Sequence, residues 1–283
     1  MRQLRQPGPV HPHRIKTCEG SLVALEIALE PGLTLNEALT RELVAHGHSC
    51  GTLVFADAAL GPFTYVVPHP APDASHVAYF SPPRTPPGRT LVEIANAIFG
   101  WRDGSPFVHC HGVWTEADGR RRGGHMMPHE TIIAEPAVAR AWASPDVAIR
   151  VDADPETNFS LFHPVALPTR RDGQGAVIAR IRPNEDLCSA IEAICLARGI
   201  AAATIRGSLG SLIGAAFDDG QRMPDIATEV LVLSGAVSPD AAGTPRALID
   251  MAVVDMRGEV HQGRLLRGEN PVCITFELVL EPA

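Results

Sequence analysis

The spacing of apolar residues predicts one amphipathic helix in each half of the chain. The apolar positions recur about every four residues: Leu35, Leu39 and Leu43 in the first half, and Leu187, Ile191 and Cys195 in the second. Thr34 and Asp186 stand where an N-cap residue is expected, and Thr34 with Glu37 matches a capping box. Gly47 and Gly199 follow the last turns, where a left-handed glycine commonly ends a helix.

Apolar runs that predict strands surround both helices in the same order. The first series comprises residues 22–29, 52–55, 93–100 and 108–114, and the second comprises residues 176–181, 203–206, 229–235 and 248–254. A glycine turn and a further strand close each series, at Gly119 and at Gly258. One main helix among short strands, given twice, predicts an α+β fold of two tandem copies of a compact domain, each with a mainly antiparallel sheet.

The polar and turn-forming segments predict where these two domains begin and end. Residues 166–175 (ALPTRRDGQG) are polar and poor in strand signals, so we place the domains at 20–167 and 174–282. The first half also carries a stretch with eight prolines, residues 62–87, which we interpret as an inserted surface loop. Residues 206–214 (RGSLGSLIG) are rich in glycine but do not open a helix, which favours a turn between strands over a phosphate-binding loop.

Histidine carries the most informative chemistry, with 12 residues in the chain. The pair His11/His13 lies in a proline-punctuated tail, and His46/His48 straddles a helix end, where histidine favourably meets the helix dipole. The pair His109/His111 differs, because its flanks predict a strand that presents both rings on one face. The following glycine turn can bring His125 alongside them. Three imidazoles with an open fourth position suit a zinc-type divalent cation, although a hydrogen-bonded polar cluster explains the same pattern.

This histidine hairpin resembles that of the PPC (plant and prokaryote conserved) domain. The similarity rests on H-C-H followed by D-G-R-R-R-G-G-H at residues 109–111 and 118–125, and on residues 228–235 (TEVLVLSG) and 274–278 (ITFEL) of the second half. The resemblance implies a compact domain, usually trimeric, that in many prokaryotic members holds a metal on the three histidines. In plant members the domain follows a DNA-binding AT-hook, whose core Arg-Gly-Arg-Pro is absent here. The corresponding second-half residues are Leu248, Asp250 and Arg264, so that copy would hold no metal.

Composition narrows the classes of protein to consider. The formal net charge is −8, and the basic clusters Arg120–Arg122 and Arg170-Arg171 are short, so we expect at most weak binding to nucleic acid. No run of about 18 apolar residues predicts a membrane span, and residues 1–20 lack the apolar core of a secretory signal. Six widely spaced cysteines suit reduced thiols, which is typical of a cytoplasmic protein.

Three functions remain open at this point. The favoured hypothesis is a metal-binding oligomeric module, trimeric by the resemblance, with a regulatory or ligand-sensing role and an unidentified small-molecule ligand. The second is a hydrolase or lyase that uses a three-histidine metal with Glu130 or Glu93 as general base. The third is a DNA-binding, transcription-associated protein. An enzyme requires a pocket at the histidines with a carboxylate in reach, a structural module requires a closed metal site, and a DNA-binding protein requires a contiguous basic surface.

Overall fold

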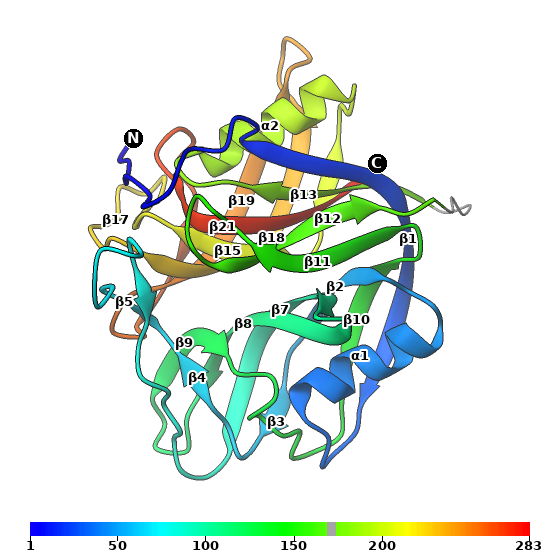
Figure 1. The fold of residues 1–283 in the computed structure, drawn as a ribbon, viewed down its shortest axis with the longest axis vertical. Helices are drawn as coiled ribbons and strands as arrows, with labels where there is room; N and C mark the ends of the chain where they lie inside the picture. The colour runs from blue at the N-terminus through cyan, green and yellow to red at the C-terminus, as the bar shows by residue number, and fades with distance from the viewer. Residues whose placement is uncertain (169–173) are drawn as a thin grey trace.

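The computed structural model describes residues 1–168 and 174–283, and the chain within them is largely β-structure (Figure 1). The helices are α1 (Leu35–Ala45) and α2 (Leu187–Ala197). The strands are β1 (Ile15–Leu29), β2 (Cys50–Phe55), β3 (Ala58–Leu60), β4 (Tyr65–Val66), β5 (Pro68–His69), β6 (Tyr79–Phe80), β7 (Thr90–Arg102), β8 (Ser105–Thr115), β9 (Arg121–Met126), β10 (Ala137–Ser144), β11 (Val147–Ala153), β12 (Ser160–Ala166), β13 (Gln174–Ile181), β14 (Ala203–Ile205), β15 (Leu209–Leu212), β16 (Ala215–Ala216), β17 (Arg222–Met223), β18 (Thr228–Pro239), β19 (Pro245–Val254), β20 (Val260–Arg264) and β21 (Val272–Pro282).

Both helices begin and end where the sequence predicts. The Thr34 side chain accepts a hydrogen bond from the Glu37 amide, and the Glu37 side chain accepts one from the Thr34 amide, which completes a capping box. The Asp186 side chain caps α2 by accepting a hydrogen bond from the Ser189 amide. Gly47 and Gly199 have φ of 74° and 65°, which glycine adopts without the steric cost of a side chain. Residues 206–214 contain a turn followed by β15, as the preference for a turn between strands predicts.

Two mainly antiparallel sheets, one in each half, place their strands in corresponding order. The first runs β1–β10–β2–β7–β8–β9, and the second runs β13–β21, then β14 with β15, then β18–β19–β20. Strand β1 joins them, because its first part pairs with β13 and its second part pairs with β10. Within the described residues, a single strand pair is parallel, β11 with β7. The prediction of a mainly antiparallel sheet is therefore confirmed.

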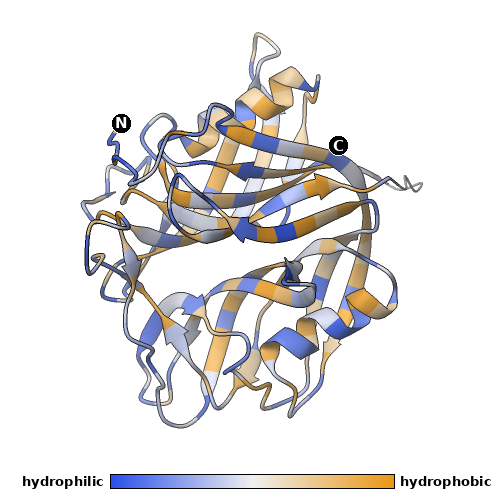
Figure 2. Cartoon of the chain, viewed as in Figure 1, coloured by the Kyte–Doolittle hydropathy of each residue, from blue (hydrophilic) through white to orange (hydrophobic). Residues whose placement is uncertain are grey.

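The molecule has four layers, with the two sheets inside and a helix outside each of them (Figure 1). One apolar cluster lies between α1 and the first sheet, and another lies between α2 and the second sheet. A third joins the two sheets through residues such as Ile98, Val113, Leu231 and Val279. Hydrophobic and hydrophilic positions alternate along the strands that face each other across the middle of the molecule (Figure 2). The interface between the halves is therefore itself a hydrophobic core.

Three features differ from the sequence-based expectation. Strand β1 begins at Ile15, before the predicted start at Leu22, because its first part belongs to the second sheet. The β11–β12 hairpin was not predicted as a unit of its own. It pairs with β7 and fills part of the space between the halves. The proline-rich stretch 62–87 contains the short strands β4, β5 and β6. Arg170 and Arg171 lie outside the described residues.

Two further properties concern the helices and the cysteines. Neither of the helices in residues 1–168 and 174–283 is long and apolar enough to cross a membrane. All six cysteines lie in these residues as free thiols, and five of them are buried.

Candidate metal centre between the two halves

The β8–β9 hairpin brings the three predicted histidines together. His109 and His111 are alternate residues of β8, so both side chains leave the same face, and His125 pairs directly with His111 across the hairpin. The ring centroids are 4.5 to 5.2 Å apart. One nitrogen from each ring lies within 4.8 Å of the other two, close enough for a single cation.

Glycine allows the second half to approach this hairpin closely. A Cβ atom at Gly123, two residues before His125, would lie 2.5 Å from the Val254 side chain. The Gly123 amide also donates to the Gly258 carbonyl at 3.3 Å. The face that carries the histidines is therefore covered by the second sheet.

Residues of the second half hold two of the imidazole rings in place. His109 Nδ1 lies 2.7 Å from Glu277 Oε2, and His111 Nδ1 lies 3.0 Å from the Val230 carbonyl oxygen. With both Nδ1 atoms as donors and both rings neutral, the two Nε2 atoms, which lie 2.9 Å apart, would present their lone pairs to a cation. Metal-binding histidines in proteins are commonly oriented in this way by a carboxylate or a carbonyl on the opposite ring nitrogen. The donor set therefore fits a divalent cation.

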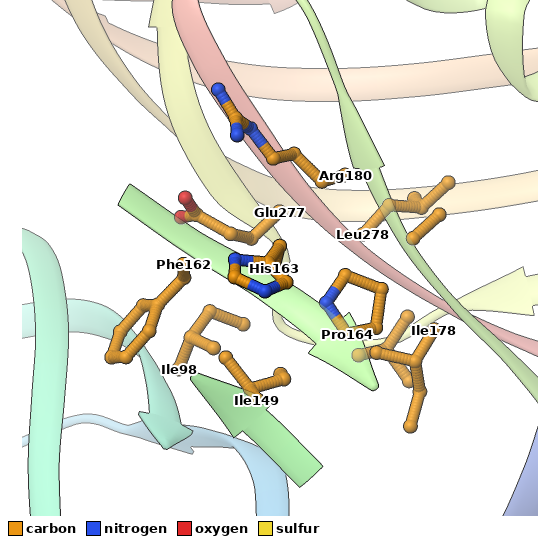
Figure 3. A pocket seen from close by; sticks show the side chains of 11 residues that line it. Ile98, Ile149, Phe162, His163, Pro164, Ile178, Arg180, Glu277 and Leu278 are labelled. Carbon is orange, nitrogen blue, oxygen red and sulfur yellow. The ribbon is translucent and has the colours of Figure 1, made fainter. Parts of the chain in front are cut away.

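A second carboxylate lies at the same point. Glu229 Oε2 is 2.7 Å from His111 Nε2, and both side chains are buried. Glu277 is in turn fixed by Thr275, whose hydroxyl donates to Glu277 Oε1 at 3.3 Å and accepts from Arg180 Nε at 3.3 Å. Figure 3 shows the Glu277 carboxylate and the Arg180 guanidinium extending the same way beside a small cavity of about 10 Å³.

Burial and charge set different protonation states within the cluster. Burial lowers the pKa of His109 and His125 well below the usual imidazole value, and the neighbouring histidines lower it further. Burial acts in the same direction on His111, but Glu229, the Val230 carbonyl and Glu277 together outweigh it and raise the pKa of His111. Two of the rings are therefore neutral, which is the form that binds a metal.

The two carboxyl groups also differ from each other. Burial raises the pKa of Glu277 to about 7. For Glu229, burial also acts to raise the pKa, but the three histidines, His111 foremost, together outweigh it and lower the pKa below the usual value. Glu229 is consequently ionised at neutral pH, whereas Glu277 lies near its midpoint.

The carboxylates beside the histidines are not those suggested by the sequence. Glu93 is exposed and forms a surface ion pair with Arg121, with an N–O distance of 2.8 Å. Glu130 is exposed on the wall of the cleft described below. Glu229 and Glu277 were missed as candidate bases, although each is an acid within a mostly apolar strand. That pattern is a usable signal, because a buried acid needs a partner.

A cleft of about 670 Å³ leads to this centre. His109, His125, Glu229 and Glu277 all contribute to its lining. The opposite wall comes from residues 76–83 of the proline-rich stretch and from the loop before β12. The volume falls within the range of small-molecule binding sites.

The other histidine pairs and the arginine cluster have local roles. His11 Nδ1 contacts the His13 backbone, and His46 Nδ1 contacts the Glu42 carbonyl at 2.8 Å at the end of α1. The three arginines of the β8–β9 turn each pair with an acid: Arg120 with Asp118, Arg121 with Glu93, and Arg122 with Glu259. This turn therefore offers little uncompensated positive charge to a phosphate backbone.

Residues 169–283 match the Plants and Prokaryotes Conserved (PCC) domain family. The second half of the chain is a PCC domain. A search of curated proteins found no match. The PCC domain identified in this way is the half without the histidine hairpin, and it supplies Glu229 and Glu277 to the histidines of the other half.

Several solved structures are also similar to part of the chain. A metal-containing protein from Archaeoglobus fulgidus is 15% identical, with a TM-score of 0.41, and the match covers 50% of this chain and 94% of that one. A plant- and prokaryote-conserved protein from Pyrococcus horikoshii is 16% identical, with a TM-score of 0.41 and coverage of 52% and 96%. A candidate DNA-binding protein from Ralstonia eutropha is 16% identical, with a TM-score of 0.38 and coverage of 51% and 96%.

Proposed function

We propose that this chain is a metal-dependent hydrolase in which His109, His111 and His125 hold one divalent cation, zinc being the best fit. The observation that carries the proposal is the 670 Å³ cleft, which reaches His109, His125 and the buried, ionised Glu229 carboxylate. A purely structural metal site would be closed, and a DNA-binding protein would expose a contiguous basic surface. An open cleft at the centre instead favours chemistry on a small molecule.

Each group of the centre has a distinct part in this proposal. A bound divalent cation supplies Lewis acidity, which polarises a carbonyl group and lowers the pKa of water. Glu229 accepts a proton from the attacking water, since its carboxylate is ionised and lies at the end of the cleft. Glu277 and the Val230 carbonyl orient His109 and His111 through their Nδ1 atoms.

The test measures zinc content and hydrolysis of 4-nitrophenyl acetate on the same preparations. We expect one zinc per chain in the wild type and none in His125→Ala, which should also lose activity. Glu229→Gln should keep its zinc and lose activity by about 10²–10⁴-fold, the usual contribution of a general base. Glu93→Gln, which removes an exposed acid, serves as the matched control and should behave as wild type.

Two results would contradict the proposal. A fully zinc-loaded wild type that is no faster than zinc-free protein would exclude hydrolysis of this ester by the metal centre. Loss of zinc from Glu229→Gln would make Glu229 a metal ligand and not a base, which corresponds to a closed structural site.

We further propose that the first half, residues 20–167, is a second copy of the PCC domain. The corresponding strand order of the two sheets and the capped helix on each outer face support this proposal. The copies differ at the histidine hairpin, where the second half has Asp250 and Arg264 paired across β19 and β20. On this proposal the copy in the second half of the chain contributes carboxylates to the centre but holds no metal itself.

We also propose that the chain forms a homo-oligomer, with a trimer as the expectation from the family. Support comes from apolar side chains left exposed on the sheets: Leu91 and Val138 in the first half and Leu248 in the second are 52–56% exposed. Such residues favour burial against another subunit. Light scattering that gives a mass near the single-chain 30.2 kDa would contradict this assembly.

A further inference from the structure

Two groups of aromatic side chains, called here the aromatic walls, line the cleft, and each contacts one of the histidines. In the first, the Tyr79 and Phe159 rings lie 5.7 Å apart and 23° from parallel, and Phe80 contacts His125 at 5.3 Å between centroids. In the second, Phe107 and Phe162 are 5.9 Å apart, and Phe162 lies 6.4 Å from His109. A flat apolar group packed against these rings would lie beside His109 and His125.

These aromatic side chains are concentrated and partly exposed. Four of the nine phenylalanines of the chain line this one cleft, and Tyr79 and Phe80 remain 41% and 37% exposed there. Exposed aromatic surface in a concave site is costly in water and is typical of a ligand-binding wall. The arrangement therefore favours an aromatic ring as the body of the ligand.

One cationic side chain lies beside these aromatic walls. The Arg102 guanidinium carbon is 4.4 Å from the centre of the Phe107 ring, and Arg102 lines the cleft. Among the described residues no carboxylate forms an ion pair with Arg102, in contrast to the arginines of the β8–β9 turn. Phe107 precedes His109 by two residues on the same face of β8, a separation of about 7 Å. Arg102 is thus about one aromatic ring away from the metal ligands.

We propose that the cleft binds small aromatic carboxylates, with the ring against the aromatic walls and the carboxylate on Arg102. The ligand would thus place its far end at the histidine centre. This inference deepens the proposed function. It rests on that function only for the chemical group that the ligand carries at the end next to the histidines. A guanidinium recognises a carboxylate through paired N–H donors, which a neutral amide of the same shape cannot match.

The test uses 4-(trifluoromethyl)phenylacetate and its neutral amide as probes, titrated by fluorine NMR into zinc-loaded and zinc-free full-length protein. We expect the carboxylate to bind wild type more tightly than the amide. Arg102→Gln should weaken carboxylate binding about tenfold, the usual effect of losing a charge-assisted hydrogen bond, and leave amide binding unchanged. Phe80→Ala should weaken both probes. Arg120→Gln, in the β8–β9 turn, is the matched control.

The zinc-free arm separates this inference from the proposed function. Carboxylate binding that depends on Arg102 in zinc-free protein supports the inference even if hydrolysis or zinc binding fails. Carboxylate binding that requires zinc and is unchanged by Arg102→Gln would overturn it, because the probe would then be only a metal ligand. Equal affinity for acid and amide, or no binding of either at millimolar concentration, would also overturn it.

Discussion

The hairpins β8–β9 and β19–β20 place different chemistry at corresponding cross-strand positions. In the first, His111 faces His125, and the second sheet covers the pair. In the second, Asp250 faces Arg264, and these side chains form an ion pair that is 38% and 46% exposed. A charged pair needs no further partner at the surface, because water solvates it. A buried histidine cluster needs partners, and here Glu229 and Glu277 supply them.

The comparison shows that the chemistry of each hairpin depends on whether the other half of the chain covers its side chains. Removal of the proposed metal should therefore destabilise the first hairpin and leave the second unaffected. A cation that binds only the folded state, present at ten thousand times its Kd, stabilises that state by about 5.5 kcal/mol. We expect chelator to lower the Tm of wild type by more than about 10 °C and to have no effect on His111→Ala.

Differential scanning calorimetry with and without chelator measures this effect. Arg264→Ala, which changes the corresponding position of the other hairpin, is the control and should show the full wild-type response to chelator. An equal response in His111→Ala and wild type would mean that the stabilising metal lies elsewhere.

A second prediction concerns the charges that fix the halves to each other. Asp154, which follows β11, accepts hydrogen bonds from Arg180 and Arg182 of the second half, and Arg180 is 3% exposed. Removal of one partner of a buried ion pair commonly costs about 3–5 kcal/mol. Asp154→Asn should therefore destabilise the protein by about this amount at pH 7, as measured by urea unfolding. Asp152→Asn, an exposed neighbour, should change stability by less than about 1 kcal/mol.

The dependence of this loss on pH follows from the direction of the pKa shift. Burial acts to raise the pKa of Asp154, but Arg180 and Arg182 outweigh it, so the pKa in the folded state is lowered. A lowered pKa contributes stability above the unfolded value, near 3.9, and this contribution is lost as the pH falls through the folded value. The difference between wild type and Asp154→Asn should thus narrow below about pH 4. A constant difference would show that the charge of Asp154 is not its cause.

A third prediction concerns the carboxylate that orients His109. Loss of such a partner commonly weakens metal binding about 10–100-fold. Glu277→Ala should lie toward the upper end of this range. Glu277→Gln should lie toward the lower end, since its carbonyl oxygen can still accept from His109 Nδ1. Competition with a zinc indicator measures both, and Glu281→Gln, whose carboxylate pairs with Arg206, is the control. Unchanged zinc affinity in Glu277→Ala would mean that Glu277 does not support a metal ligand.

Local sequence patterns were sufficient for the helices and for the histidine hairpin. Caps at Thr34 and Asp186 and glycines at 47 and 199 act within a few residues, and the pairing of His111 with His125 requires only a hairpin turn. The contacts of Glu229 and Glu277 with the histidines span 118 and 168 residues (229 − 111 and 277 − 109). They depend on how two sheets pack face to face, which no local pattern specifies. The wall formed by Tyr79 and Phe80 was missed for the same reason.

The smallest effect is expected at the exposed pair of the second hairpin. Arg264 lowers the pKa of Asp250, mainly through their hydrogen bond, so the pair contributes stability above about pH 4 and loses it below. Because both side chains are well exposed, a double-mutant cycle of Asp250→Ala and Arg264→Ala should give less than about 1 kcal/mol. That value should fall further at 1 M salt, where screening acts within about 3 Å. A coupling of several kcal/mol would mean that another surface covers this hairpin too, as expected if it lies at a subunit contact.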